Sequence, residues 1–141
     1  MLSYYEKKIQ DILDKKLIRK SKSPWSCSTF YVQKQAELKR KTPRLVINYK
    51  PLNDVWRWIR YPIPNNKDLL QRLVNSKVFS KFDMKSRFWQ IHITEKYRYK
   101  TAFVVPFGNY EWNVMPFGLK NAPSEFQNIM ITTQKVLFHS L

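Results

Sequence analysis

The first apolar pattern along the chain has the spacing of an amphipathic helix. In residues 2–17, apolar side chains recur every three or four positions, at Tyr5, Ile9, Ile12, Leu13 and Leu17. This spacing places them on one face of an α-helix, with charged residues on the other. We predict that the helix begins at Ser3, because Glu6 stands three positions later, as in a capping box.

Two short strands follow and predict a hairpin. A basic, serine-rich loop separates them from the helix, and its Pro24 excludes helix there. Residues 28–33 (STFYVQ) alternate as a strand, residues 36–43 form a charged turn, and residues 44–48 resume the strand pattern. The predicted hairpin therefore has a basic tip.

The next segment changes from extended to helical. Residues 60–64 (RYPIP) are expected to be extended, because a residue that precedes proline is pushed out of helical space. Asn65 or Asn66 then caps a short helix that runs through Leu73. Its leucines share one side of the helix: Leu69, Leu70 and Leu73.

The run VFSKFDMKSRFWQIHI, residues 78–93, is the most informative part of the chain. Residues 78–83 predict an apolar strand that ends on the single carboxylate of Asp83, and residues 90–93 predict a second strand. An acid at the end of a buried strand is typical of metal-dependent active sites, but aspartate is also a common turn residue. The residues alone leave both roles open for Asp83.

The last third of the chain predicts a second hairpin and a long helix. Residues 101–105 and 110–114 are rich in strand formers, and a Pro-Phe-Gly-Asn turn joins them. A loop over residues 115–123 follows, and Pro123 suits the first turn of a helix that continues to about Val136. Helices and hairpins in this order predict an α+β fold.

Charge is the strongest compositional signal. The 141 residues include 26 Lys and Arg against 10 Asp and Glu, a formal net charge of +16. A basic protein with aromatic residues among its cations suits a polyanion, and nucleic acid is the expected partner. The alternatives are a generally basic, solvated surface or attraction to an anionic membrane. Because there is no long basic amphipathic helix, we expect no membrane partner.

The remaining composition indicates one packed domain in a reducing compartment. Hydrophobic residues make up 43% of the chain and aromatic residues 16%, as in a folded core. A single cysteine, Cys27, excludes an internal disulfide, and the N-terminus has no apolar signal core. We therefore expect a cytoplasmic or nuclear protein that is not secreted. Cysteine and histidine are too few for a zinc site.

Four blocks of the sequence, taken in order, resemble the reverse transcriptases of plant pararetroviruses (caulimovirids) and gypsy-type LTR retrotransposons. The blocks are PWSCSTFYVQK with PRLVINYKPLN, the RYPIP segment, the VFSKFDMKSRFWQIHI run, and MPFGLKNAPSEFQ. The resemblance implies an RNA-directed DNA polymerase and a partial right-hand polymerase fold. The fingers would span about residues 1–75 and the first part of the palm about residues 76–137 of this single domain.

The resemblance also implies roles for individual residues. Asp83 matches the first metal-binding aspartate of the catalytic centre, which implies Mg²⁺ or Mn²⁺ as the cofactor. Arg44 matches the arginine that contacts the triphosphate of a deoxynucleoside triphosphate, and Phe88 matches the aromatic that screens its sugar. Phe117 matches a nucleotide-contacting position; without the resemblance it would be a core residue, and Arg44 one surface cation among many. The residues implied to hold an RNA or DNA template-primer are Lys39, Arg40, Lys41 and Lys120.

Two departures from the family pattern affect these expectations. The family's Tyr-x-Asp-Asp hairpin, its thumb and its RNase H domain have no counterpart here, and no aspartate follows Asp83. We therefore expect a fragment that is inactive as a lone chain, with a missing palm or RNase H partner chain as one way to complete it. The alternatives are a non-enzymatic, basic nucleic-acid-binding remnant of an integrated viral element and an incompletely folded relic. Arg87 stands where the family has a glycine, so we expect strain at the turn beside Asp83.

Overall fold

The computed structural model describes residues 2–32, 44–62, 65–79, 81 and 83–139. Its helices are α1 (Leu2–Asp14), α3 (Lys50–Val55), α4 (Asn66–Leu73), α5 (Glu95–Arg98) and α6 (Ala122–His139), with the 3₁₀ helices η1 (Arg87–Gln90) and η2 (Tyr99–Thr101). Its strands are β1 (Ile18–Lys20), β2 (Thr29–Val32), β3 (Arg44–Ile47), β4 (Phe103–Val105) and β5 (Gly108–Trp112). The fold is therefore of mixed α and β structure, as expected.

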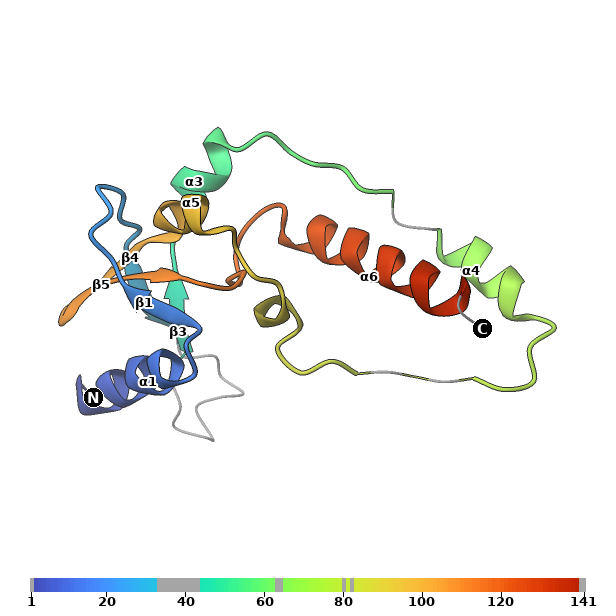
Figure 1. The fold of residues 1–141 in the computed structure, drawn as a ribbon, viewed down its shortest axis with the longest axis horizontal. Coiled ribbons are helices and arrows are strands. Elements are labelled where there is room, and N and C mark those ends of the chain that lie inside the picture. Colours follow the sequence, from blue (N-terminus) through green and yellow to red (C-terminus); the bar gives the residue numbers. More distant parts are fainter. Residues whose placement is uncertain (1, 33–43, 63–64, 80, 82, 140–141) are drawn as a thin grey trace.

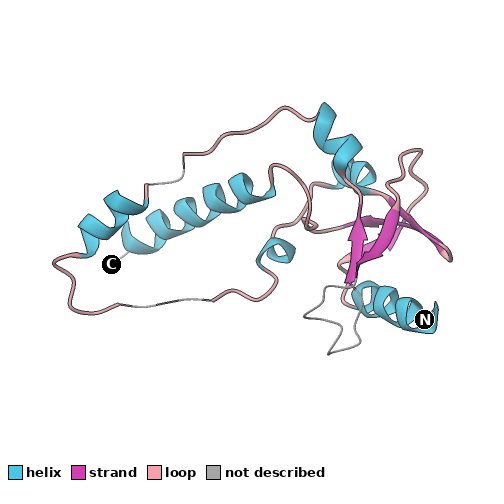
Figure 2. Ribbon diagram, turned by 180° about the vertical axis from the view of Figure 1, so that it is seen from behind, coloured by secondary structure: helices cyan, strands magenta, loops and turns pink. Residues whose placement is uncertain are grey.

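Helices and strands gather at one end of the molecule, from which α6 extends away (Figure 1). The chain between α3 and η1 runs out to the far end of α6 and back, and it carries α4 on the way (Figures 1 and 2). α4 has no buried residue. The core consequently lies at the strand-containing end. In the described part of the chain, no helix is both long and apolar enough to cross a membrane.

The main sheet is antiparallel, with strand order β1-β5-β4. The β4–β5 hairpin confirms the prediction for residues 101–114, although its turn is only two residues long because Val105 pairs with Gly108. The sequence pattern does not predict β1, which pairs with β5 so that Ile18 lies opposite Trp112 and Arg19 opposite Glu111.

The pairing predicted between the strands in residues 28–33 and 44–48 is confirmed by the antiparallel pair β2–β3, in which Thr29 lies opposite Ile47. This pair is joined to the main sheet through Cys27, whose N–H donates to the carbonyl of Ala102 at 2.9 Å and whose carbonyl accepts from Val104 N–H at 3.0 Å. The basic tip, with Lys39, Arg40 and Lys41, lies outside the described residues.

The core forms where α1, α3 and the hairpins meet. Phe103, Ile18 and Tyr49 are at most 2% exposed, and Tyr49 donates its hydroxyl to the carbonyl of Thr101 at 2.9 Å. Burial raises the pKa of Tyr49 well above its ordinary value, so this hydroxyl stays a neutral donor. A second buried hydroxyl group, in Thr101, accepts from the backbone N–H of Trp112 at 2.9 Å. These bonds give the buried hydroxyl groups of Tyr49 and Thr101 their partners.

The predicted helices are confirmed, with two changes at their ends. α4 begins after Asn65, whose side chain accepts from Lys67 N–H, and α6 covers the predicted range. α1 starts before Ser3, so the predicted cap there is wrong. It ends earlier than predicted because Lys16 takes a left-handed φ of 57°, and Leu17 N–H donates to Ile12 O at 3.0 Å, which closes the helix as in a Schellman motif.

Both strands predicted for residues 78–93 are wrong. Residues 78, 79, 81 and 83 form no strand, and Val78 and Phe79 are 87% and 63% exposed. Around residues 90–93 the chain instead leaves η1, and only His92 makes a bridge, to Val114. A strand needs a neighbour for its backbone hydrogen bonds, and the described residues offer none beside residues 78–83.

Candidate functional site

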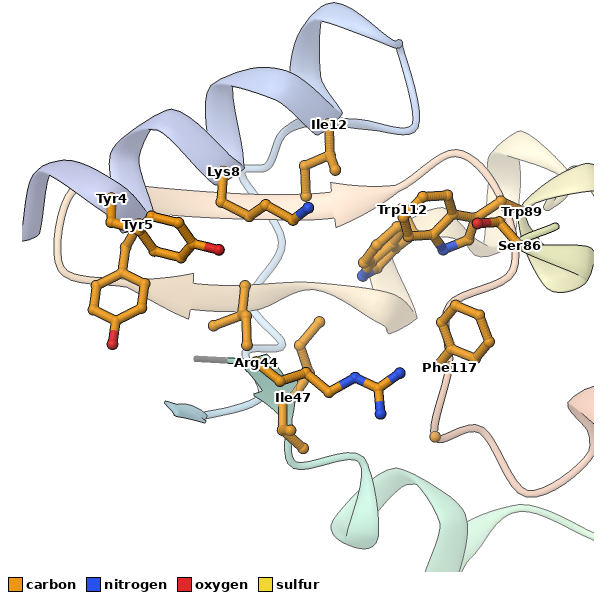
Figure 3. A pocket seen from close by; sticks show the side chains of 13 residues that line it. Tyr4, Tyr5, Lys8, Ile12, Arg44, Ile47, Ser86, Trp89, Trp112 and Phe117 are labelled. Atoms are coloured by element: carbon orange, nitrogen blue, oxygen red, sulfur yellow. The ribbon is translucent and has the colours of Figure 1, made fainter. Parts of the chain in front are cut away.

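A pocket of about 630 Å³ opens between α1, β3 and the end of β5. Its size falls within the range of small-molecule sites in proteins, roughly 300–1,000 Å³. Figure 3 shows the lining side chains at close range. They are Tyr4, Tyr5, Lys8 and Ile12 of α1, residues 44–47 of β3, Ser86 and Trp89 near η1, and Trp112, Phe117 and Gly118.

Two cations enter the pocket from different elements. Lys8 extends into it from α1 and Arg44 from β3, with the Arg44 guanidinium directed toward Phe117 (Figure 3). None of the described residues that line the pocket is acidic. The pocket therefore has the electrostatics of an anion site, because no carboxylate there neutralises the two cations.

The wall opposite α1 is aromatic. The Phe117 ring lies 5.3 Å from that of Phe88 and 6.0 Å from that of Trp89, and Trp89 lies 6.1 Å from Trp112. Phe88 is 7% exposed and does not line the pocket, whereas Phe117 is 46% exposed. The structure thus brings Arg44 and Phe117 together at one pocket, with Phe88 packed behind Phe117. Phe126 also packs on Phe88, at 5.9 Å.

Three features of the pocket were not predicted from the sequence: Lys8, Trp89 and Trp112. The indole N–H of Trp89 is buried, and no acceptor for it lies among the described residues. A buried donor of this kind is costly unless a partner binds it. Lys8 carries no local signal, since it is one of several lysines on the polar face of α1.

In the turn that leads to η1, the left-handed residue is not the one expected. Ser86, and not Arg87, takes the left-handed conformation, with φ of 50°. Arg87 begins η1, and its guanidinium carbon lies 4.9 Å from the Phe88 ring and 5.6 Å from the Phe126 ring. The expectation of strain at Arg87 is therefore wrong, because the backbone of Arg87 is not in the left-handed region. Its side chain instead makes favourable cation–π contacts.

Asp83 lies apart from the pocket and is exposed. In the described ranges, no three His, Cys, Asp or Glu side chains come close enough together to hold a metal ion. Mg²⁺ sites use one or two carboxylates together with water and substrate phosphates. Asp83 alone could supply one such ligand, but the described residues do not form a site for two ions.

Lys120 also lies outside the pocket. Its ammonium group donates to the carbonyls of Asn53 at 3.4 Å and Trp56 at 3.5 Å, near the end of α3. Cys27 does not line the pocket; it is half-buried, and burial raises the pKa of its thiol. A thiol with a raised pKa is a poor nucleophile at neutral pH.

Comparison with known proteins connects this geometry to a family. Residues 32–137 match the family "Reverse transcriptase (RNA-dependent DNA polymerase)". The chain is 50% identical over 126 residues to the genome polyprotein of Petunia vein clearing virus. This match covers 89% of this chain and 6% of that polyprotein. It is 46% identical over 126 residues to the enzymatic polyprotein of Cauliflower mosaic virus, covering 89% of this chain and 19% of that protein.

Solved structures give the same result for the fold. The protease-reverse transcriptase of a foamy virus in complex with dsDNA has a TM-score of 0.78 at 24% identity, over 94% of this chain and 27% of that one. The foamy viral enzyme in complex with an RNA/DNA hybrid has a TM-score of 0.75 at 25% identity, over 90% of this chain and 16% of that one. The chain therefore spans well under a third of the length of each relative it matches here.

Proposed function

Because this chain belongs to the reverse transcriptase family, we propose that its pocket binds a deoxynucleoside triphosphate and that its basic surface holds an RNA or DNA template-primer. The observation that carries the proposal is the meeting of Arg44 and Phe117 at one pocket, where Lys8 adds a second cation. The reaction to which this binding would contribute is nucleotidyl transfer to a primer 3′ hydroxyl.

The pocket has the two kinds of surface that a nucleotide requires. Arg44 supplies a planar fork of N–H donors, which suits the oxygens of a phosphate, and Lys8 adds a point charge. Phe117 and Trp89 supply apolar area for the base and sugar. Phe88 would act by supporting the Phe117 ring.

The proposal is tested by nucleotide binding to the purified chain, followed by calorimetry or by quenching of tryptophan fluorescence. Arg44→Ala should weaken deoxynucleoside triphosphate binding by about tenfold or more, because charge-assisted hydrogen bonds contribute about 1.5–3 kcal/mol. Arg72→Ala is the matched control, since Arg72 is an exposed arginine of α4 that does not line the pocket. Equal affinities for the two variants would contradict the proposal.

A second ligand separates phosphate recognition from stacking. The deoxynucleoside without its phosphates should bind weakly, and Arg44→Ala should not change that binding, because the variant removes only a phosphate contact. Phe117→Ala should weaken both ligands. If the deoxynucleoside lost as much affinity as the triphosphate in Arg44→Ala, the guanidinium would have a structural role, and the assignment of Arg44 to the triphosphate would be wrong.

Template-primer binding has its own signature. With a net charge of +16, and if about six phosphates are contacted, the logarithm of affinity should fall with the logarithm of salt concentration at a slope near −5 on duplex. The alternative of a non-enzymatic nucleic-acid-binding protein gives the same slope but no nucleotide binding. The two measurements together therefore distinguish the functions.

Reverse transcriptases use divalent metal ions, and we propose Mg²⁺ or Mn²⁺ as the ion that Asp83 would help to hold. In-line transfer needs two ions about 3.5–4 Å apart, and the described residues do not provide carboxylates for both. Further ligands would have to come from beyond the described residues. We therefore expect no primer extension by the purified 141-residue chain. Extension that disappears in Asp83→Asn would show that a complete site exists.

A further inference from the structure

Trp58 is an exposed aromatic side chain with two cations close to its ring. Its indole is part of the extended segment that follows α3, and the residue is 58% exposed. The guanidinium carbon of Arg60 lies 5.4 Å from the ring centroid, and the ammonium nitrogen of Lys120 lies 5.5 Å from it. No hydrophobic cluster of the described residues includes Trp58. Core packing therefore does not explain this tryptophan.

The backbone on both sides of Trp58 is fixed by one buried amide. Asn121, which is 5% exposed, donates its side-chain N–H to the carbonyl of Arg57 at 3.0 Å and accepts from Ile59 N–H at 3.1 Å. These two bonds hold the residue before Trp58 and the residue after it. The indole is thus solvent-exposed on a fixed backbone, so that ordering it for a ligand costs little.

The backbone of Lys120, the second cation near the Trp58 ring, is also held in place. Lys120 N–H donates to the side chain of Asn53 at 2.8 Å, and the Asn53 amide donates to the carbonyl of Gly118 at 2.8 Å. The loop at residues 118–121 is in this way tied to the end of α3, and Lys120 is held beside the indole. Trp58 and Arg60 lie in one segment, and the fold brings Lys120 to them from a segment about 60 residues further along the chain.

We propose that Trp58 is a stacking platform for a base of a single-stranded nucleic acid, with Arg60 and Lys120 contacting phosphates on either side. Aromatic rings flanked by cations are how proteins bind single strands without reading their sequence. A base that stacks on the indole would displace Arg60 from the ring, because an exposed cation–π contact is weaker than a base–aromatic stack. The freed guanidinium is then available to a phosphate.

The charges favour a nucleic acid over a protein partner for this surface. An apolar protein interface tends to exclude charged groups from its centre, whereas here both groups that contact the ring are cations. This inference rests on the template-primer binding proposed above and adds a specific contact to it.

The test compares two single-stranded oligonucleotides of equal length, one with bases and one abasic, by fluorescence anisotropy. Trp58→Ala should weaken binding of the strand with bases by roughly 5- to 150-fold, the range of one lost stack, and should change binding of the abasic strand little. Trp58→Phe should retain most of the affinity. Trp25→Ala is the matched control, because Trp25 is 45% exposed and packs edge-on against Tyr99.

The salt dependence gives a second readout that a structural role would not change. Trp58→Ala should leave the salt slope as it is, whereas Arg60→Met should reduce its magnitude by about 0.7, the value of one phosphate contact on a single strand. Equal losses on both strands, or equal effects of Trp58→Ala and Trp25→Ala, would overturn the inference alone. If the parent chain bound neither strand at low salt, the proposed template-primer binding would fail with it.

Discussion

The ion pair between Arg19 and Glu111 should contribute more to stability than any other described ion pair in the chain. Glu111 is 5% exposed, and its carboxylate accepts from Arg19 Nε at 2.7 Å and from the Ser21 hydroxyl at 2.6 Å. Arg19 also donates to Glu95 at 3.0 Å. Because Arg19 lies directly opposite Glu111 in the register of β1 and β5, this contact fastens β1 to the sheet.

The loss of folding stability on substitution depends on which charge remains buried without its partner. Removing one partner of a fully buried pair costs about 3–5 kcal/mol. Here the Arg19 side chain is 40% exposed and the Ser21 hydroxyl would remain, so Arg19→Met should cost less, about 2–3 kcal/mol. The Glu95 side chain is 76% exposed, and surface pairs contribute about 0–1 kcal/mol. Glu95→Gln should therefore have a small effect.

Urea unfolding, followed by tryptophan fluorescence and circular dichroism, measures these differences. Arg19→Met should lower the midpoint with an unchanged m-value. The double variant Arg19→Met/Glu111→Met should be more stable than Arg19→Met alone, because no buried carboxylate is then left without its partner. If Arg19→Met cost no more than Glu95→Gln, or if the double variant were the less stable one, the carboxylate would be effectively solvated and the reasoning wrong.

Three further outcomes are expected. Arg87→Gly should destabilise the chain by about 1 kcal/mol in urea unfolding, through the lost contact with Phe88 and the added backbone freedom; stabilisation would restore the idea of strain at this turn. Leu70→Lys should reduce self-association in sedimentation, since Leu70 is 64% exposed on α4, which has no buried residue, whereas the control Gln71→Lys should not. The hydrogen bond from Arg19 lowers the pKa of Glu95. The ionised Glu95 therefore stabilises the fold above its unfolded-state pKa, and this stabilisation is lost as the pH falls through the pKa of the folded state. Glu95→Gln should accordingly lose less stability between about pH 6 and pH 3 than the parent chain.

The elements predicted correctly from the sequence are those with local signals. β2–β3 and β4–β5 show alternation and turn residues, and α4 has its cap at Asn65. β1 is three residues long, with two charged residues. It becomes a strand because Ile18 reaches Trp112, 94 positions away, and no local pattern contains that information. α3 was likewise missed, since it has no side-chain cap and depends on the burial of Leu52.

The residues of the candidate site likewise fall into those that the sequence identified and those that only the structure reveals. Arg44 and Phe117 were placed by their match to family motifs, and the structure brings both to one pocket; their roles toward a nucleotide remain predictions. Lys8 and Trp112 could not be found by motif, because each reaches the pocket only through the packing of α1 and the β1–β5 register. Sequence reasoning thus finds the residues that carry a motif and misses those that complete the surface around them.

Residues 78–83 show why a strong strand pattern can still fail to predict a strand. Strand propensity mostly measures how well a side chain fits a half-buried pleated surface, and this surface exists only when a neighbouring strand supplies it. In the described structure neither edge of the β1-β5-β4 sheet pairs with these residues, and Val78 is 87% exposed. The apolar side chains therefore indicate a surface that is able to pair, and the position of Asp83 at its end depends on that pairing. A second chain or segment that paired here would bury Val78 and Phe79, which lead to Asp83.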